Sequence, residues 1–319
     1  MDVEQRSELT FALLETQGGT DVKVAVTGAA GFIGKWLTAE LSSFHEVVMI
    51  DKVSTDPACV TANLLDEDVV RDWLIQTSPD VCYHLAAQVG RVFGEQDISH
   101  TVRSNAEMTT IVAKWCGELG IRLAYVSTSE VYGDQGDIEC GEYGRLVLPH
   151  NLYGLTKRWG EEVSRLFAPK DLVIARLSMP YGPGVPPGRG RRAMDTMLWQ
   201  AHHQKPIIVH RGAERSWCWV GDTVRGLRML IEQPTGGTYN VGRADAPVSM
   251  AYIAVKACEL AGAPTSLIQE IDPPGAQTVV KRLSTDRIRR LGWRPEVELD
   301  EGMTLVYEHV SKYPWQESQ

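Results

Sequence analysis

The 319-residue sequence lacks the features of a membrane, secreted or nucleic-acid-binding protein. It has no run of about 18 apolar residues, so we expect no membrane-spanning helix. The first 20 residues carry charged side chains and no long apolar stretch, which does not fit a secretory signal. Basic residues are also fewer than acidic ones: the chain has 32 Lys and Arg and 41 Asp and Glu, which gives a net charge of −9. Such an acidic chain is a poor candidate for binding nucleic acid or an anionic membrane.

Cysteines are few and scattered. The six of them form no Cys-x-x-Cys pair, so we expect neither a disulfide framework nor a zinc ribbon. The histidines have no spacing typical of metal ligands, and the adjacent His202 and His203 would point in different directions on a helix. The sequence therefore predicts a cytoplasmic protein with reduced thiols and no metal site.

Short apolar runs alternate with longer helical patterns from Asp21 onward. The predicted strands are residues 22–26, 46–50, 80–85, 122–127 and 172–177, and the predicted helices are residues 35–43, 66–77, 101–119 and 153–167. Strands separated by helices of this length form right-handed βαβ units. The pattern therefore predicts an α/β fold with a Rossmann-type, doubly wound parallel sheet.

The pattern changes after Tyr181. Residues 182–190 hold four glycines and three prolines, which is typical of a loop. A helix at 194–203 and strands at 207–210 and 238–241 then mix with proline-rich turns. We interpret residues 1–20 as an N-terminal extension and 21–178 plus 216–242 as the sheet domain. Residues 179–215 plus 243–319 are expected to form a smaller mixed α/β lobe over the carboxyl edge of the sheet, where such sheets bind ligands.

The strongest local motif is TGAAGFIG at residues 27–34, which follows a predicted strand and opens a helix. Gly28 permits a tight turn, Gly31 lets a diphosphate approach the backbone, and Gly34 allows close packing of the helix on the sheet. The helix N-terminus offers free N–H groups to phosphates. This motif in this context predicts a bound dinucleotide.

An acidic residue ends the second predicted strand. Asp51 lies 20 residues after Gly31, where a carboxylate can accept hydrogen bonds from both ribose hydroxyls. It would repel a 2′-phosphate, so we expect NAD rather than NADP. Lys52 beside it weakens this preference slightly.

A tyrosine and a lysine lie four residues apart at the start of a predicted helix. Tyr153 and Lys157 therefore share one helix face. A nearby ammonium stabilises a phenolate, so we expect Lys157 to lower the pKa of Tyr153 toward neutrality. Such a tyrosine can take a proton from an alcohol while hydride leaves the same carbon.

A polar segment, STSEVYGD at residues 127–134, follows the predicted strand 122–127. There the Thr128 hydroxyl can bridge the phenol and a substrate hydroxyl. Glu130 is a candidate acid or base in a closed site, although a structural ion pair is the alternative.

These segments together resemble the extended short-chain dehydrogenase/reductase family of NAD-dependent nucleotide-sugar epimerases and dehydratases. The resemblance runs from about Val22 to about Pro295. It rests on TGAAGFIG, Asp51, HLAAQ at 84–88, STSEVYGD, YGLTK at 153–157, Arg176 with YGP at 181–183, Arg215 with VGD at 220–222, YNVG at 239–242 and LGWRP at 291–295.

The resemblance implies tightly held NAD in the sheet domain and an NDP-sugar, with UDP favoured, in the lobe. Thr128, Tyr153 and Lys157 match the catalytic trio of the family, and Lys157 would also hold the nicotinamide ribose. Asn63 stands where the family usually has Asp, and its carbonyl can still accept from the adenine amino group. The implied cofactor residues are Gly28, Gly31, Phe32, Ile33, Gly34, Asp51, Lys52, Asn63, Leu64, Leu85, Ala86, Ala87, Tyr153 and Lys157.

The substrate residues implied in the same way are Gln88, Met179, Arg191, Arg192 and Arg215. Arg215 matches a residue that contacts the diphosphate or sugar in the family. Met179 replaces the usual Asn, so one polar contact to the substrate is missing. Arg189, Arg191 and Arg192 are either an alternative phosphate clamp or solvated charge.

The family shares one first step, oxidation of the sugar at carbon 4, and then diverges. The STSEVYGD segment looks most like UDP-glucuronate decarboxylases, in which Thr-Ser-Glu and an Arg at the position of Arg215 surround the carboxylate. Ser129 replaces the acidic Asp of dTDP-glucose dehydratases, which disfavours dehydration, and simple 4-epimerases need no Glu at position 130. We expect a catalytic role for Ser129 and Glu130 in a decarboxylase, with 4-epimerase and dehydratase as alternatives.

A non-enzymatic alternative is a catalytically silent NAD-binding sensor on the same fold. Its expected mark is loss of Tyr153 or Lys157, and the sequence retains both. The family resemblance also implies a homodimer in which helices 101–119 and 153–167 pack as a four-helix bundle.

Overall fold

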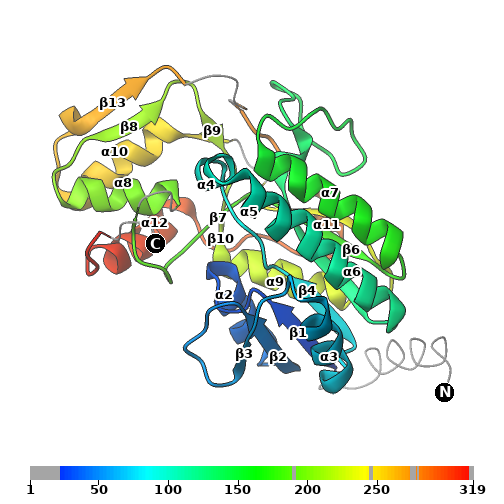
Figure 1. Cartoon of the computed structure of the whole chain (residues 1–319). Coiled ribbons are helices and arrows are strands. Elements are labelled where there is room, and N and C mark those ends of the chain that lie inside the picture. Colours follow the sequence, from blue (N-terminus) through cyan, green and yellow to red (C-terminus); the bar gives the residue numbers. More distant parts are fainter. Residues whose placement is uncertain (1–21, 189–191, 244–246, 274–277, 279, 316–319) are drawn as a thin grey trace.

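One parallel sheet organises the first part of the chain (Figure 1). The computed structural model describes residues 22–315, apart from 189–191, 244–246, 274–277 and 279. The strands are β1 (Lys23–Thr27), β2 (Glu46–Asp51), β3 (Cys59–Thr61), β4 (Val81–His84), β5 (Arg122–Thr128), β6 (Val173–Leu177) and β11 (Gly237–Val241). Their order in the sheet is β11-β6-β5-β4-β1-β2-β3. The strands β2 and β3 are added on one side of β1 and the later strands on its other side, which confirms the predicted Rossmann-type sheet.

Helices cover both faces of this sheet (Figure 1). Side chains alternate between faces along a strand, so Val24 and Val26 pack with α2 (Phe32–Leu41) and α9 (Val220–Ile231). Ala25 points to the other face, toward α3 (Glu67–Thr77) and α6 (Met108–Glu118). Helix α7 (Leu152–Phe167) packs on α6 and β5. Burial of both faces explains why the strands read as nearly continuous apolar runs.

The prediction of one regular helix over residues 101–119 is wrong, because a π-helical turn interrupts it. The segment consists of α5 (Ile98–Val102), a π-helical turn over Arg103–Glu107, and α6. Asn105 in the turn is buried and bonds to the backbone of Gln88, accepting at 2.7 Å from its N–H and donating at 3.0 Å to its carbonyl. Its amide also donates to the Thr156 hydroxyl at 3.1 Å. These bonds satisfy a polar side chain that a regular apolar helix face would leave unpaired.

The remaining elements gather around a separate apolar cluster. The helices concerned are α8 (Ala193–His202), α10 (Met250–Ala261) and α12 (Leu299–Val310). The strand pairs are β8 (Ile207–His210) with β13 (Ile268–Ile271), β7 (Met179–Tyr181) with β10 (Trp217–Trp219), and β9 (Glu214–Arg215) with β12 (Val248–Ser249). Two shorter helices, α4 (Arg91–Gln96) and α11 (Asp286–Arg290), complete the fold. The proposed N-terminal extension lies outside the described residues.

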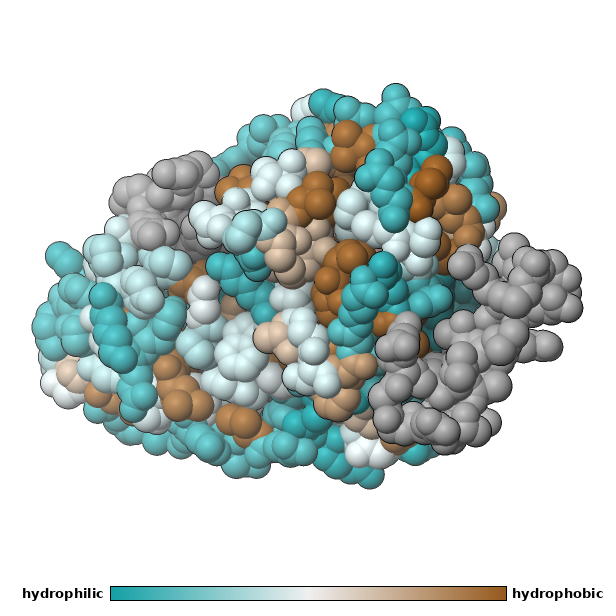
Figure 2. Space-filling view, turned by 90° about the horizontal axis from the view of Figure 1, so that it is seen from below, coloured by the Kyte–Doolittle hydropathy of each residue, from teal (hydrophilic) through white to brown (hydrophobic). Residues whose placement is uncertain are grey.

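The face of the molecule drawn in Figure 2 is mainly hydrophilic. Figure 2 shows one face, on which hydrophobic residues form small groups separated by hydrophilic ones. Along the described residues, no helix is both long enough and apolar enough to cross a membrane.

Candidate active site

The glycine-rich turn lies between the end of β1 and the start of α2. Gly28 has a φ of +73°, and a Cβ there would lie 2.6 Å from the backbone nitrogen of Ala86. A Cβ on Gly34 would lie 2.2 Å from the carbonyl oxygen of Gly28, so the helix approaches the strand as predicted. Gly31 caps α2, and Phe32 and Ile33 form its first turn. The structure thus brings this turn next to Leu85 and Ala86, and Ala87 follows them in the chain.

Asp51 lies at the end of β2 and its side chain bonds to the same turn. One carboxylate oxygen accepts a hydrogen bond from the Ala30 N–H at 3.0 Å, and the other accepts from the Val53 N–H at 3.1 Å. The carboxylate keeps further lone pairs for ribose hydroxyls. Lys52 follows it and is exposed.

The two residues predicted at the adenine differ in environment. Leu64 is buried in the core, whereas Asn63 is exposed and its side-chain oxygen accepts from the Leu65 N–H at 3.1 Å. The adenine contact of Asn63 therefore stays a prediction.

The residues of this edge fit a dinucleotide. The turn around Gly28 and Gly34 leaves no room for side chains, which is the cradle a pyrophosphate needs. At the end of β6, the buried Ser178 hydroxyl oxygen has no hydrogen-bond partner among the described residues. A buried polar atom without a partner is costly unless a ligand or water completes it. NAD, when bound, would lie along the turn with Asp51 at its adenosine ribose.

The start of α7 is fixed against Glu130. The Asn151 side chain caps the helix by accepting from the Gly154 N–H at 2.7 Å, and its amide donates to the Glu130 carboxylate at 2.9 Å. A Cβ on Gly154 would lie 2.9 Å from the carbonyl oxygen of Glu130, so only glycine allows this approach. Tyr153, between these residues, is thereby held beside Glu130.

The Thr128 hydroxyl lies close enough to the Tyr153 phenol to lower its pKa. The pKa of Tyr153 nevertheless lies well above the ordinary value, because burial and the negative charge of Glu130 raise it. The prediction that Lys157 lowers the pKa of Tyr153 toward neutrality is therefore wrong. The Lys157 ammonium instead lies 4.2 Å from the centre of the Tyr125 ring.

Lys157 is itself strongly affected by its surroundings. Its side chain is buried, and burial lowers its pKa to about 7, while the charge of Glu161 opposes this shift. Lys157 therefore changes charge close to physiological pH.

Glu130 is half-buried and forms an ion pair with the buried Lys281, a residue that sequence analysis did not single out. Burial alone would raise the pKa of Glu130, but Lys281, Asn151 and Arg215 together hold it below its usual range. The Lys281 segment is anchored where Cys140 pairs with Leu283, and Cys140 N–H donates to the Arg282 carbonyl at 2.8 Å.

Arg215 also faces this pair. It lies on β9, and its guanidinium donates to the carbonyls of Glu214 at 2.7 Å and Thr278 at 3.0 Å. Its positive charge acts on Glu130 and on Lys281. The site therefore holds one carboxylate between two cations.

The other predicted substrate residues are more dispersed. The backbone of Gln88 is held by Asn105, and Met179 lies on β7, where its N–H donates to the Ser216 carbonyl at 3.1 Å. Arg192 stacks on Phe32 at 3.6 Å from the ring centre and pairs with Asp195 at 2.5 Å. Arg191, with Arg189, lies outside the described residues.

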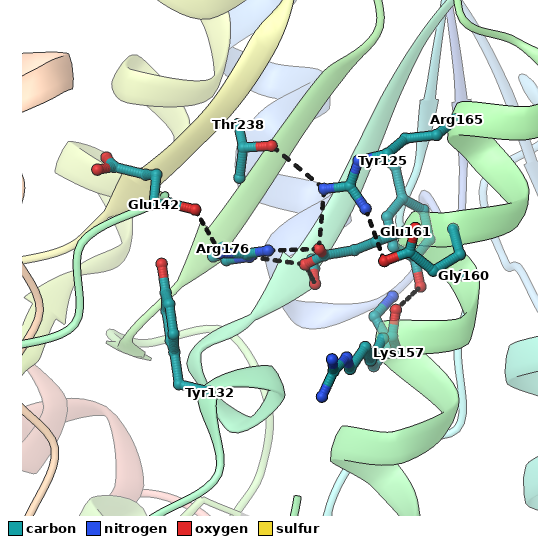
Figure 3. Close-up of polar contacts among 12 residues, drawn as sticks. Tyr125, Tyr132, Glu142, Lys157, Gly160, Glu161, Arg165, Arg176 and Thr238 are labelled. Atoms are coloured by element: carbon teal, nitrogen blue, oxygen red, sulfur yellow. Dashed lines mark hydrogen bonds and ion pairs between the residues drawn. The ribbon is translucent and has the colours of Figure 1, made fainter. Parts of the chain in front are cut away.

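A second ion pair, buried on both sides, lies near Lys157 (Figure 3). Arg176, at the end of β6, donates to both oxygens of Glu161 on α7, at 2.8 and 2.6 Å. The guanidinium also donates to the Glu142 carbonyl at 3.2 Å and lies over the Tyr132 ring. The sequence motifs contain Arg176 but gave no signal that Glu161 is its partner.

His84 is a third buried polar group near the site. Its ring nitrogens bond to the hydroxyls of Thr27 at 2.8 Å and Thr109 at 3.0 Å. Burial, with the charge of Lys157, lowers its pKa to about 3, so it is neutral at physiological pH. Among the described residues, no group of three or more His, Cys, Asp or Glu could hold a metal ion.

Curated proteins with similar sequences include UDP-glucuronic acid decarboxylases. One from Arabidopsis thaliana, UDP-glucuronic acid decarboxylase 5, is 26% identical over 91% of this chain and 89% of its own length. One from Xenopus tropicalis is 27% identical over 91% of this chain and 72% of its own length.

Solved structures with the same fold include the UDP-glucose 4-epimerase of Thermus thermophilus in complex with NAD. It has a TM-score of 0.83 and 22% identity, and the match covers 91% of this chain and 99% of that one. MoeE5 in complex with UDP-glucuronic acid and NAD has a TM-score of 0.80 and 24% identity, over 90% and 98% of the two chains.

The family model described as the NAD dependent epimerase/dehydratase family matches residues 24–242. This match confirms the family expected from the motifs, together with its NAD cofactor. The chain therefore belongs to the NAD dependent epimerase/dehydratase family.

Proposed function

We propose that the chain is an NAD-dependent decarboxylase of UDP-glucuronate or a closely related UDP-hexuronate. The observation that carries this proposal is the arrangement of Glu130 between Lys281 and Arg215. Two cations and one carboxylate leave a net positive charge, which favours a sugar that brings a further carboxylate. The names of the curated relatives, and the UDP-glucuronic acid in one structural neighbour, support the same substrate class.

The first step is oxidation of the hydroxyl at carbon 4 of the sugar. Tyr153 takes the hydroxyl proton in its phenolate form, and the Thr128 hydroxyl, which lowers the pKa of the phenol, aligns the two oxygens. NAD, when bound, supplies the acceptor for the hydride that leaves carbon 4. Lys157 in its cationic form would hold the nicotinamide ribose, the role that the family resemblance implies for it.

The second step is loss of carbon dioxide. The ketone at carbon 4 and the carboxylate at carbon 6 make a β-keto acid, so the electrons of the bond between carbons 5 and 6 pass into the ketone as carbon dioxide leaves. Protonation at carbon 5 and return of the hydride to carbon 4 then give a UDP-pentose. Lys281 and Arg215 hold the carboxylate until it leaves, and Ser129 and Glu130 border carbon 5.

A second candidate is 4-epimerisation of the same hexuronate. The same two cations would bind the carboxylate whether or not it is lost. The two reactions differ in their products, because decarboxylation yields a pentose and epimerisation yields a hexuronate inverted at carbon 4.

The other predicted site residues keep their expected roles within this proposal. Asn63 and Leu64 border the adenine, and Gln88 and Met179 border the sugar. Arg191 and Arg192 bind the substrate diphosphate. Arg192 stacks on Phe32 in the first turn of α2, and this contact fixes the position of its guanidinium.

We also infer a homodimer, formed through α6 and α7. These helices lie side by side (Figure 1), and α7 exposes Leu155, Trp159 and Leu166. Their spacing along the helix places the three side chains on one outward stripe, which is typical of a helical interface. The expected cytoplasmic location belongs to the same proposal and is supported by six buried cysteines without disulfide bonds.

The experiment is a panel of UDP-, GDP-, CDP- and dTDP-sugars with NAD, followed by NMR of the products. The expected result is conversion of UDP-glucuronate to a UDP-pentose with release of carbon dioxide. A hexuronate inverted at carbon 4 would promote the second candidate, and conversion of neutral sugars alone would overturn the proposal.

A further inference from the structure

Glu161 lies one turn beyond Lys157 on the inward face of α7 (Figure 3). Its side chain is completely buried, and its two oxygens accept from Arg176 at 2.8 and 2.6 Å. The first oxygen also accepts from the Ser127 hydroxyl at 2.7 Å, and the second from Arg165 at 3.3 Å. Three side chains from three elements thus hold one carboxylate in place behind the catalytic lysine.

These donors also keep Glu161 ionised. Burial raises the pKa of its carboxyl, but Arg176, Ser127 and Arg165 together bring it below the ordinary value. A carboxylate so deep in the protein needs such partners, because an unpaired buried charge is very costly.

The titratable groups around Lys157 come from four elements. Tyr125 on β5 lies under the ammonium, His84 on β4 feels its charge, and Tyr153 precedes it on α7. His84 is neutral, and burial raises the pKa values of both tyrosines, so these three carry no charge at neutral pH. Glu161, paired with Arg176 of β6, supplies the negative charge that opposes the burial of Lys157.

We propose that Glu161 is a positioning residue that keeps Lys157 cationic and fixes the strand end carrying Thr128. The first effect acts through the one-turn spacing on α7, and the second acts through the Ser127 hydroxyl, which neighbours Thr128. The consequence for turnover rests on the proposed oxidation at carbon 4, whereas the effect on Lys157 itself does not.

The substrate-independent test is a titration of Lys157. Protein labelled with ¹³C at lysine side chains is titrated by NMR, and the Lys157 signal is assigned by its absence in Lys157→Met. In Glu161→Gln, which keeps the shape but removes the charge, we expect the midpoint to fall by about 1 pH unit or more. Glu162→Gln is the matched control, because Glu162 is the next residue, is exposed and also pairs with Arg165. An unchanged midpoint in folded Glu161→Gln would overturn the proposal.

A second variant guards against misfolding, since Glu161→Gln leaves Arg176 without its partner. Glu161→Gln/Arg176→Met removes both charges, and we expect a smaller downward shift of the Lys157 midpoint, because loss of the Arg176 cation partly offsets loss of the Glu161 anion. Glu161→Asp keeps the charge and should keep the midpoint within the control range. A Glu161→Asp variant that folds and shows the same fall in midpoint as Glu161→Gln would contradict the assigned role.

Turnover gives the corresponding kinetic result. If Lys157 must be cationic, kcat falls as pH rises through its pKa, and this alkaline limb should move to lower pH in Glu161→Gln with little change in KM. A purely structural role would lower kcat equally at all pH values. If UDP-hexuronate is not a substrate, the kinetic arm fails while the Lys157 titration still decides the inference.

Discussion

The ammonium group of Lys281 forms an ion pair with the carboxylate of Glu130, although the two residues lie 151 positions apart in the sequence. The pair joins the 3₁₀ turn after β5, which carries Glu130, to the segment before α11. It places a cation within the candidate active site in addition to Arg215. The ion pair therefore places the proposed site for the substrate carboxylate at the carboxyl edge of the sheet.

Lys281→Met should impair carboxylate-bearing substrates selectively. The variant removes one cation and leaves the half-buried Glu130 without its ion-pair partner, so we expect kcat/KM for UDP-glucuronate to fall by about 100-fold or more. Affinity for NAD should be unchanged, which isothermal titration calorimetry can measure. Lys256→Met is the matched control, because Lys256 pairs with Glu259 and Asp300 elsewhere on the surface. Equal losses in both variants would argue against a role of Lys281 at the substrate.

Asp51→Asn should weaken the discrimination against NADP. The amide oxygen can still accept from one backbone N–H of the turn, but the variant no longer carries the charge that repels a 2′-phosphate. We expect the ratio of the NADP and NAD dissociation constants to fall about tenfold. Equilibrium binding of both cofactors measures it, with Asp56→Asn as a control that removes an exposed carboxylate outside the glycine-rich turn. An unchanged ratio would remove Asp51 from the ribose site.

His84→Asn should make the free energy of unfolding less dependent on pH below pH 7. The folded pKa of His84 is about 3, below the value of 6.5 for an unperturbed histidine, so the unfolded state binds the proton more readily between these pH values. Stability is therefore lost as pH falls below 6.5, by about 2 kcal/mol from this residue at pH 5. Urea unfolding at pH 7 and pH 5 measures the difference, which should be smaller in the variant. Equal pH slopes would show that His84 is not buried as a neutral ring.

Trp159→Glu should separate the proposed dimer. A carboxylate in the centre of the exposed stripe on α7 would have to be desolvated in the interface, at a cost greater than a rim substitution. Light scattering coupled to size exclusion should give twice the chain mass for the unmodified protein and the single mass for the variant. Leu305→Glu on α12 is the control for an exposed apolar residue elsewhere. A monomeric unmodified protein at micromolar concentration would contradict the dimer.

The regular parts of this fold were predictable because their signals are local. Buried parallel strands read as apolar runs, and the Gly28–Gly34 turn is recognisable between a strand and a helix. The strand β3 and the short strands β7, β9, β10 and β12 escaped prediction, since runs of two or three residues carry no periodicity. The π-helical turn at Asn105 was missed because its cause, the backbone of Gln88, lies outside the helix.

The site was predictable only where its residues belong to compact motifs. Asp51 and Thr128 end strands and Tyr153 opens a helix, with Lys157 one turn later, and the Thr128 hydroxyl lowers the pKa of Tyr153. Lys281 lies in a segment of ordinary composition far along the chain, so nothing local marks it as the partner of Glu130. The pKa of Tyr153 was predicted with the wrong sign because burial and Glu130, which depend on the tertiary fold, outweigh helix spacing.

The most direct measurement is release of labelled carbon dioxide from UDP-glucuronate carrying ¹³C at carbon 6, with the unmodified protein and with Tyr153→Phe. The proposed mechanism predicts labelled carbon dioxide and a UDP-pentose from the unmodified protein. It predicts at least about 100-fold slower release from Tyr153→Phe, which retains NAD but cannot take the proton. All label remaining in a hexuronate, or equal rates from the two proteins, would contradict it.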